Sequence, residues 1–192
     1  MAMHVTAFGQ TEDRLHQLEQ AIRAQHLTVS FSLKGEDALI EKSEHITADV
    51  VVMLVQRPTA LVVEAIRLLQ LNRPMPVVLF ADNTDEKLTD LVIKSGAASF
   101  VVDGFESSRL KNIIDTALLR HQEMQALKDE LIRAKLTIVE RKNIERAKGM
   151  LMKQKQMDED QAYRTMRQAA MSQNKRMIDV ANTIIDLADM FN

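Results

Sequence analysis

Residues 49–55 read DVVVMLV, in which one aspartate precedes six consecutive apolar side chains. A run of this length matches one β-strand, and the lack of polar alternation is typical of a strand buried on both faces of a parallel sheet. Residues 77–80, VVLF, repeat the pattern. Around these two runs, short apolar segments alternate with amphipathic segments from His4 to about Arg120, which predicts repeated strand–helix units.

These units predict an α/β domain over residues 1–120, built on a five-stranded parallel sheet of the flavodoxin-like type. Gly96 is expected to end the fourth helix, and Ser107 is expected to cap the fifth. We expect strands at 4–8, 27–32, 50–55, 77–80 and 99–102, with intervening helices at 12–25, 35–43, 61–71 and 85–94.

A long helix is predicted to follow, because no glycine or proline occurs between Ser107 and Gly149. Apolar residues within it alternate at spacings of three and four, which is the seam of a short coiled coil and favours a homodimer. The alternative is an amphipathic helix that folds back on its own domain. The linker is assigned to residues 121–140, and its seam consists of Met124, Leu127, Leu131, Ala134 and Ile138.

The C-terminal segment 141–192 is predicted to be an all-α bundle of three helices, the first continuous with the linker. Asp158 and Gln161 have the spacing of a capping box, so a helix is expected to begin there and to end near residues 172–174. A last helix is expected at about 176–190. Between residues 141 and 176 there are ten lysines and arginines against four acids, whereas the whole chain has a formal net charge of -2.

This concentration of cations indicates a polyanionic partner, and RNA hairpin loops fit it because they expose unstacked bases beside phosphates. An ordinary charged helix surface is the plainer alternative. Gly149 allows close approach of another helix or of a nucleotide. Tyr163 either packs in the core or stacks on a base. The candidate RNA-binding residues are Arg141, Lys142, Arg146, Lys148, Lys153, Arg164, Arg167, Lys175 and Arg176.

Other functional classes find little support in the sequence. Cysteine is absent, the five histidines are scattered without metal-ligand spacing, and neither G-x-G-x-x-G nor a P-loop occurs. We therefore expect no enzyme activity, no catalytic residues, no cofactor and no metal. The apolar runs are too short to span a bilayer, and no signal peptide is recognisable, so a cytoplasmic protein without membrane contact is expected.

Three motifs, ERAKGMLM at 145–152, DQAY at 160–163 and DVA at 179–181, resemble the ANTAR module of AmiR- and NasR-type transcription antiterminators. The small residues Ala147, Ala162 and Ala181 fall where that family packs its helices closely, and Gly149 and Tyr163 belong to the same motifs. The resemblance extends over about residues 127–187. It implies binding to tandem stem-loops in a leader mRNA, which prevents a terminator from forming.

The N-terminal domain resembles the receiver domains of response regulators, so the whole chain is similar to NasT-type regulators. Receivers are phosphorylated on an aspartate at the end of the third strand, where this chain has Leu54. Gly9 and Gln10 replace the magnesium-holding acids, Ala81 replaces a hydroxyl residue and Asp103 replaces a lysine. The resemblance therefore implies a pseudo-receiver that works without phosphorylation. Glu12 and Asp13, close by, are interpreted as helix-dipole partners.

In NasT-type systems a nitrate- or nitrite-sensing partner sequesters the regulator, so a NasS-like repressor protein is the expected partner, and nitrate assimilation the expected pathway. Two alternatives stay open. One is a DNA-binding response regulator that reads duplex as a dimer. The other is an antiterminator of a different operon, such as one for amide utilisation.

Overall fold

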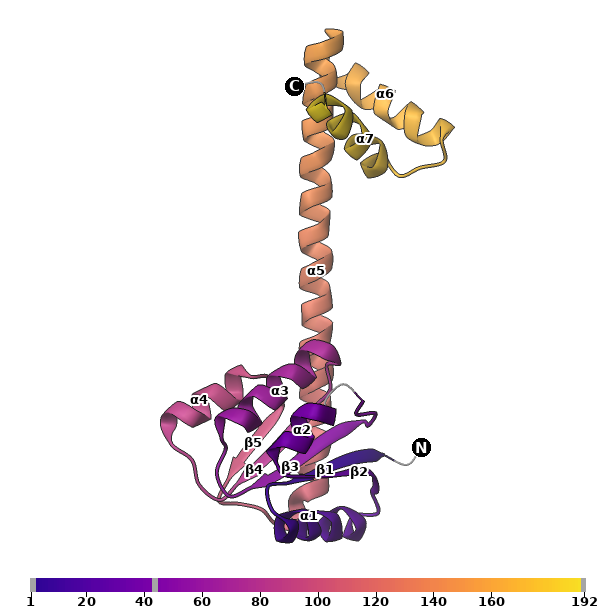
Figure 1. Cartoon of the computed structure of the whole chain (residues 1–192). Helices are drawn as coiled ribbons and strands as arrows, with labels where there is room; N and C mark the ends of the chain where they lie inside the picture. Colours follow the sequence, from indigo (N-terminus) through magenta and orange to yellow (C-terminus); the bar gives the residue numbers. More distant parts are fainter. Residues whose placement is uncertain (1–2, 43–44, 191–192) are drawn as a thin grey trace. The chain divides into compact units, whose positions relative to one another are not determined.

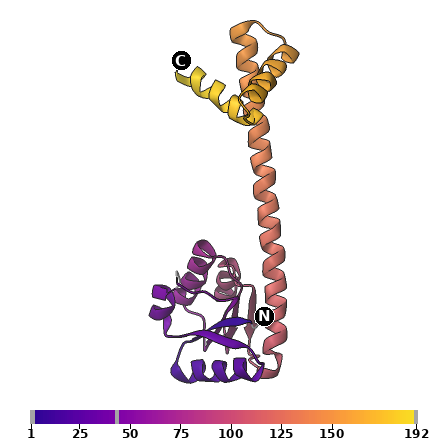
Figure 2. The same cartoon turned by 90° about the vertical axis from the view of Figure 1, so that its right-hand side faces the viewer.

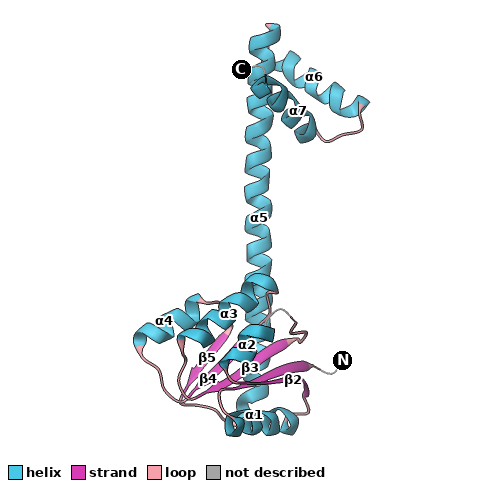
Figure 3. Ribbon diagram, viewed as in Figure 1, coloured by secondary structure: helices cyan, strands magenta, loops and turns pink. Residues whose placement is uncertain are grey.

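The computed structural model describes residues 3–42 and 45–190, and the chain divides into two compact units, Met1–Gln125 and Ala126–Asn192. All strands of the described residues lie in the first unit, as Figure 3 shows, and the second is helical. The predicted fold class is therefore confirmed. The elements in chain order are β1 (His4–Gly9), α1 (Glu12–Ala24), β2 (Thr28–Lys34), α2 (Glu36–Lys42), β3 (Val50–Val55), α3 (Ala60–Asn72), β4 (Val77–Ala81), α4 (Glu86–Lys94), β5 (Ser99–Val102), a 3₁₀ turn (Ser107–Arg109), α5 (Leu110–Lys155), α6 (Glu159–Ser172) and α7 (Met177–Met190).

The sheet is parallel, with strand order β2-β1-β3-β4-β5 (Figure 1). This is the flavodoxin-like order, in which the chain reverses direction across the sheet between β1 and β3. Every residue of β3 and β4 is buried, as their uninterrupted apolar sequences predict. The carboxyl ends of β1, β3, β4 and β5 consequently meet at one edge, where ligands bind in folds of this kind.

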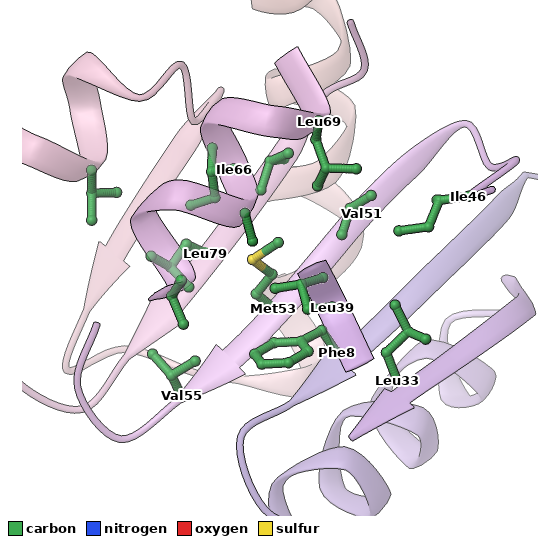
Figure 4. Close-up of a cluster of buried hydrophobic side chains, with 14 of the residues drawn as sticks. Phe8, Leu33, Leu39, Ile46, Val51, Met53, Val55, Ile66, Leu69 and Leu79 are labelled. Atoms are coloured by element: carbon green, nitrogen blue, oxygen red, sulfur yellow. The ribbon is translucent and has the colours of Figure 1, made fainter. Parts of the chain in front are cut away.

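One face of the sheet is covered by α2, α3 and α4 (Figure 4). Phe8 of β1, Met53 of β3 and Leu79 of β4 form the sheet side of this core, and Ile66 and Leu69 of α3 pack on them. Side chains alternate in direction along a strand, so the neighbouring residues of the same strands must be covered from the other side.

The opposite face is covered by α1 and the first turns of α5 (Figures 1 and 2). Leu18 and Ile22 of α1 and Ile114 of α5 pack on Val52 of β3, and all four side chains are fully buried. The two cores explain why polar and apolar residues do not alternate in the central strands, because both faces of the sheet are buried there.

The predicted element boundaries agree with the structure to within two residues, apart from two local differences. The predicted second helix included Ser43, which lies outside the described residues. Ser107 does not cap α5: it begins a 3₁₀ turn whose N-cap, Glu106, makes no side-chain capping hydrogen bond. No helix in the described parts of the chain is long and apolar enough to cross a membrane.

In the second unit, α6 and α7 pack against the C-terminal part of α5 (Figure 2). The capping box is present, with Asp158 accepting from the Gln161 N–H at 2.7 Å and Gln161 accepting from the Asp158 N–H at 3.1 Å. Asn174, with φ of 51°, follows α6 in the left-handed conformation that asparagine tolerates better than most residues. The core of this bundle contains Ala147, Met166, Ile178, Ala181 and Ile185.

Candidate nucleic-acid interface

Six of the nine candidate RNA-binding cations are exposed and have no salt-bridge partner among residues 3–42 and 45–190. They lie on all three bundle segments: the end of α5, the outer side of α6, and the turn before α7. Their guanidinium and ammonium groups therefore keep their charge available to an outside partner. They are Arg141, Lys142, Lys153, Arg164, Arg167 and Lys175.

Lys148 has a different environment, because its side chain is only 11% exposed and lies between two carboxylates. Its ammonium group is 2.6 Å from Glu145 on α5 and 2.7 Å from Glu159 in the first turn of α6. The hydrogen bonds that Lys148 donates, first to Glu145 and then to Glu159, raise the pKa of Lys148. The stabilisation is complete below the ordinary pKa of lysine and is lost only as the pH rises through the raised value. Lys148 therefore ties α6 to α5 and has no free charge for RNA.

Two further candidates are held by acids. Arg146 of α5 donates to Asp189 of α7 at 2.9 Å. Arg176, just before α7, lies 3.1 Å from Asp179 and 3.5 Å from Glu140 of α5. The hydrogen bond from Arg176 is the main cause of the lowered pKa of Asp179. These exposed pairs dock α7 on α5, together with a 3.0 Å amide hydrogen bond from Asn143 to Asn182.

The small residues of the motifs lie where the helices meet, since Ala147, Ala162 and Ala181 are all fully buried. Gly149 and Tyr163 differ from what helix packing would require. A Cβ added to Gly149 would meet nothing within 4 Å, so none of the described helices packs closely against that backbone. Tyr163 is 45% exposed and therefore lies on the surface of α6, outside the bundle core.

The proposed dimer seam is exposed on α5. Met124, Leu127, Leu131 and Ile138 are between 53% and 68% exposed, and Ala134 between them is exposed as well. A second apolar row on the same helix was not anticipated from the sequence. It consists of Ile132, Leu136 and Val139, each more than half exposed. Their spacing of four and three was the signal that could have revealed them.

The residues that were predicted to form a degenerate phosphorylation site lie together at the carboxyl edge of the sheet. Gly9, the last residue of β1, pairs in register with Leu54 of β3, and Ala81 ends β4. Asp103 follows β5, and its N–H donates to the Ala81 carbonyl at 2.9 Å. Leu54 is fully buried in the core that also contains Phe80. The end of β3 therefore carries a buried apolar side chain at the predicted phosphoacceptor position.

Position 9 has no room for a side chain. A Cβ built on Gly9 would lie 2.3 Å from the backbone nitrogen of Leu15 in α1. The neighbouring Gln10 is engaged by hydrogen bonds: its amide nitrogen donates to Glu36 at 3.1 Å, and its amide oxygen accepts from the Gln56 N–H at 3.0 Å. Position 9 therefore cannot hold a larger side chain in this conformation, and the side chain at position 10 is held by hydrogen bonds.

Arg14 of α1 and Asp82, which follows β4, form an ion pair at the same edge of the sheet. The guanidinium of Arg14 donates to both carboxylate oxygens of Asp82, and both side chains are partly shielded from solvent. A bidentate pair of this kind holds its partners in a fixed geometry. Among the described residues, Arg14 is the only cation that forms a salt bridge with Asp82.

The first unit is a five-stranded α/β domain with the fold of a receiver domain, and a helical bundle follows it in the chain. Comparison with solved structures agrees. The signal receiver domain of a modulated diguanylate cyclase from Desulfovibrio desulfuricans G20 matches with a TM-score of 0.57 at 11% identity, covering 65% of this chain and 99% of that structure.

The helical bundle gives a further match. Residues 133–185 match the ANTAR domain. The transcriptional regulatory protein PdtaR of Mycobacterium tuberculosis is 29% identical over 152 residues, covering 79% of this chain and 74% of PdtaR. The nitrate regulatory protein of Klebsiella oxytoca is 40% identical over 70 residues, which are 35% of this chain and 18% of that protein.

Replacing Lys148 with methionine should destabilise the bundle. Methionine keeps the packing volume of the side chain but leaves Glu145 and Glu159 close together without a cation. We expect the Tm to fall by several degrees in a thermal melt followed by circular dichroism. Lys153→Met, an exposed change on the same helix, is the control and should leave the Tm unchanged. Equal Tm values for the two variants would show that the tie contributes nothing.

Adding one methyl group to two glycines should have opposite effects. Gly9→Ala is expected to lower the free energy of unfolding by about 1–3 kcal/mol, because the methyl group overlaps the backbone of Leu15. Gly149→Ala should raise it by about 1 kcal/mol, since alanine favours an open helical position. Urea denaturation measures both. An unchanged stability of Gly9→Ala would show that α1 moves aside freely.

Proposed function

We propose that the C-terminal unit binds tandem stem-loops in a leader mRNA and that the chain thereby prevents transcription termination. The observation that carries this proposal is the set of six unpaired cations on an ANTAR domain. These charges stay free although carboxylates on the same bundle neutralise Arg146, Lys148 and Arg176. Free cations on three successive segments provide contacts to a folded phosphate backbone, and RNA loops add unstacked bases.

We further propose that the chain acts as a homodimer through its exposed seam on α5. A helix whose seam residues are more than half exposed gains stability when those residues leave water, at about 25 cal/mol for each Å² buried. Two bundles in one dimer match two adjacent stem-loops. The domain limits that we propose are 1–120 for the pseudo-receiver, 121–140 for the coiled coil and 141–192 for the RNA-binding part.

The pseudo-receiver is proposed to work without phosphorylation, in the cytoplasm, under the control of a ligand-sensing partner protein. Support comes from the closed edge of the sheet, where Gly9 has no space for an acid and Leu54 replaces the phosphoacceptor. The 40% identity to the nitrate regulatory protein over 70 residues supports nitrate or nitrite assimilation as the pathway. A NasS-like repressor is the partner that fits this assignment.

The RNA proposal predicts tight binding to an RNA with two adjacent short-loop hairpins, and weaker binding to one hairpin or to the matching DNA duplex. Arg167→Glu should weaken the affinity for the tandem RNA by roughly tenfold or more, since a free cation becomes a repelling charge. Gel shifts over a salt series measure this. Lys87→Glu on α4, an exposed position with the same change of charge, is the control. Equal affinity for all three nucleic acids would contradict the proposal.

The dimer proposal predicts that Leu131→Lys abolishes self-association, because it places a charge in the apolar seam. Light scattering after size exclusion should show a dimer for the natural chain and a monomer for the variant. Leu71→Lys on α3, where the leucine is also exposed, should leave the dimer intact. A natural chain that stays monomeric, both alone and with tandem RNA, would remove the seam from the proposal.

A further inference from the structure

Tyr163 is the only aromatic side chain among the described residues of the second unit. It is 45% exposed, whereas Ala162, Met166 and Ala170 on the inner side of α6 are buried. The core of the bundle is therefore complete without the tyrosine ring. Tyr163 and Met171 are the large apolar side chains that α6 leaves exposed, and of the two only Tyr163 offers a flat π-face that a ligand can cover.

Two cations without salt-bridge partners among the described residues lie close to Tyr163 on α6. Arg164 follows Tyr163 directly, and Arg167 lies one turn further along α6 at the i,i+4 spacing that makes side chains neighbours. Neither arginine has a carboxylate within salt-bridge distance in the part of the chain that the structure describes. Asp160 lies on the same side one turn earlier, in the first turn of the helix, where an acid complements the helix dipole.

An exposed aromatic ring on the same helix surface as unpaired guanidinium groups has the chemistry of a base-stacking site. Bases in hairpin loops are unstacked and offer flat π-faces, and the phosphates on either side of such a base are anionic. A protein partner would need acidic groups for both arginines in addition to a group that covers the ring. Charge complementarity therefore favours a loop nucleotide as the occupant of this surface.

We propose that Tyr163 stacks on an unpaired base of a hairpin loop, while Arg164 and Arg167 contact the phosphates beside it. This proposal deepens the RNA-binding function proposed above and rests on it. It assigns base recognition to α6, and it leaves to the exposed cations of α5 and of the turn before α7 the contacts with the remaining backbone.

The composition of the chain allows a direct test, because it contains one tyrosine and no tryptophan. Protein labelled with 3-fluorotyrosine has a single ¹⁹F resonance, which comes from position 163. We expect the tandem-hairpin RNA to shift this resonance, with saturation at the same RNA concentration as in a gel shift. A blunt RNA duplex of equal length, which has no loop bases, should leave the resonance unmoved.

Substitutions separate stacking from general surface effects. Tyr163→Phe should keep the affinity for the tandem RNA, because phenylalanine retains the ring, and Tyr163→Ala should weaken it about tenfold or more. Leu187→Ala on α7, where the leucine is 51% exposed, is the matched control and should have no effect. Circular dichroism verifies that each variant is folded.

The outcomes distinguish the stacking proposal from the RNA-binding function on which it rests. If the RNA binds in the gel while the resonance stays fixed and Tyr163→Ala keeps full affinity, stacking is overturned and RNA binding stands. A shift of the same size with the blunt duplex would also overturn it, since loop bases would not be required. If no RNA binds at all, both proposals fail. Loss of affinity in Tyr163→Ala with retention in Tyr163→Phe supports stacking.

Discussion

The N-terminal unit depends on one constraint, the complete burial of β3. All six of its side chains are apolar and inaccessible to water, so the strand requires helices on both faces of the sheet and strands on both of its edges. The same burial disfavours phosphoryl chemistry, because a carboxylate at Leu54 would have to be desolvated without a partner. The apolar sequence that builds the centre of the sheet therefore leaves no charged group at the predicted phosphoacceptor position.

The architecture could be predicted from the sequence because it follows from apolar periodicity, which is a property of single segments. The strands β3 and β5 begin and end at their predicted residues, and the capping box at Asp158 sets the start of α6 as expected. The site was less predictable, since the availability of a cation depends on acids that are distant in sequence. Arg146 pairs with Asp189, and nothing in the local pattern around Arg146 shows this contact.

The availability of Lys148 was also hard to predict, although one of its two acidic partners is close in sequence. Its place in a basic stretch made it a candidate for RNA contact, and Glu145, three residues earlier, was visible as a helical neighbour. The second acid, Glu159, arrives only when α6 folds back against α5. Lys148, which is bound by two carboxylates, stabilises the bundle that carries the free cations. A count of charges in the sequence cannot distinguish such a structural cation from a free one. Tyr163 is the converse case, a residue with a core-like sequence context and a surface position.

The contact between Gly9 and α1 has an evolutionary consequence. The space that an acidic side chain would need at the end of β1 now contains the backbone of Leu15. A single substitution at position 9 therefore cannot place an acidic side chain at the end of β1 unless the start of α1 also shifts, and the hydrogen bonds of Gln10 and the Arg14–Asp82 pair resist such a shift. An acid at this position thus requires several simultaneous changes, which makes it hard to reach by single substitutions.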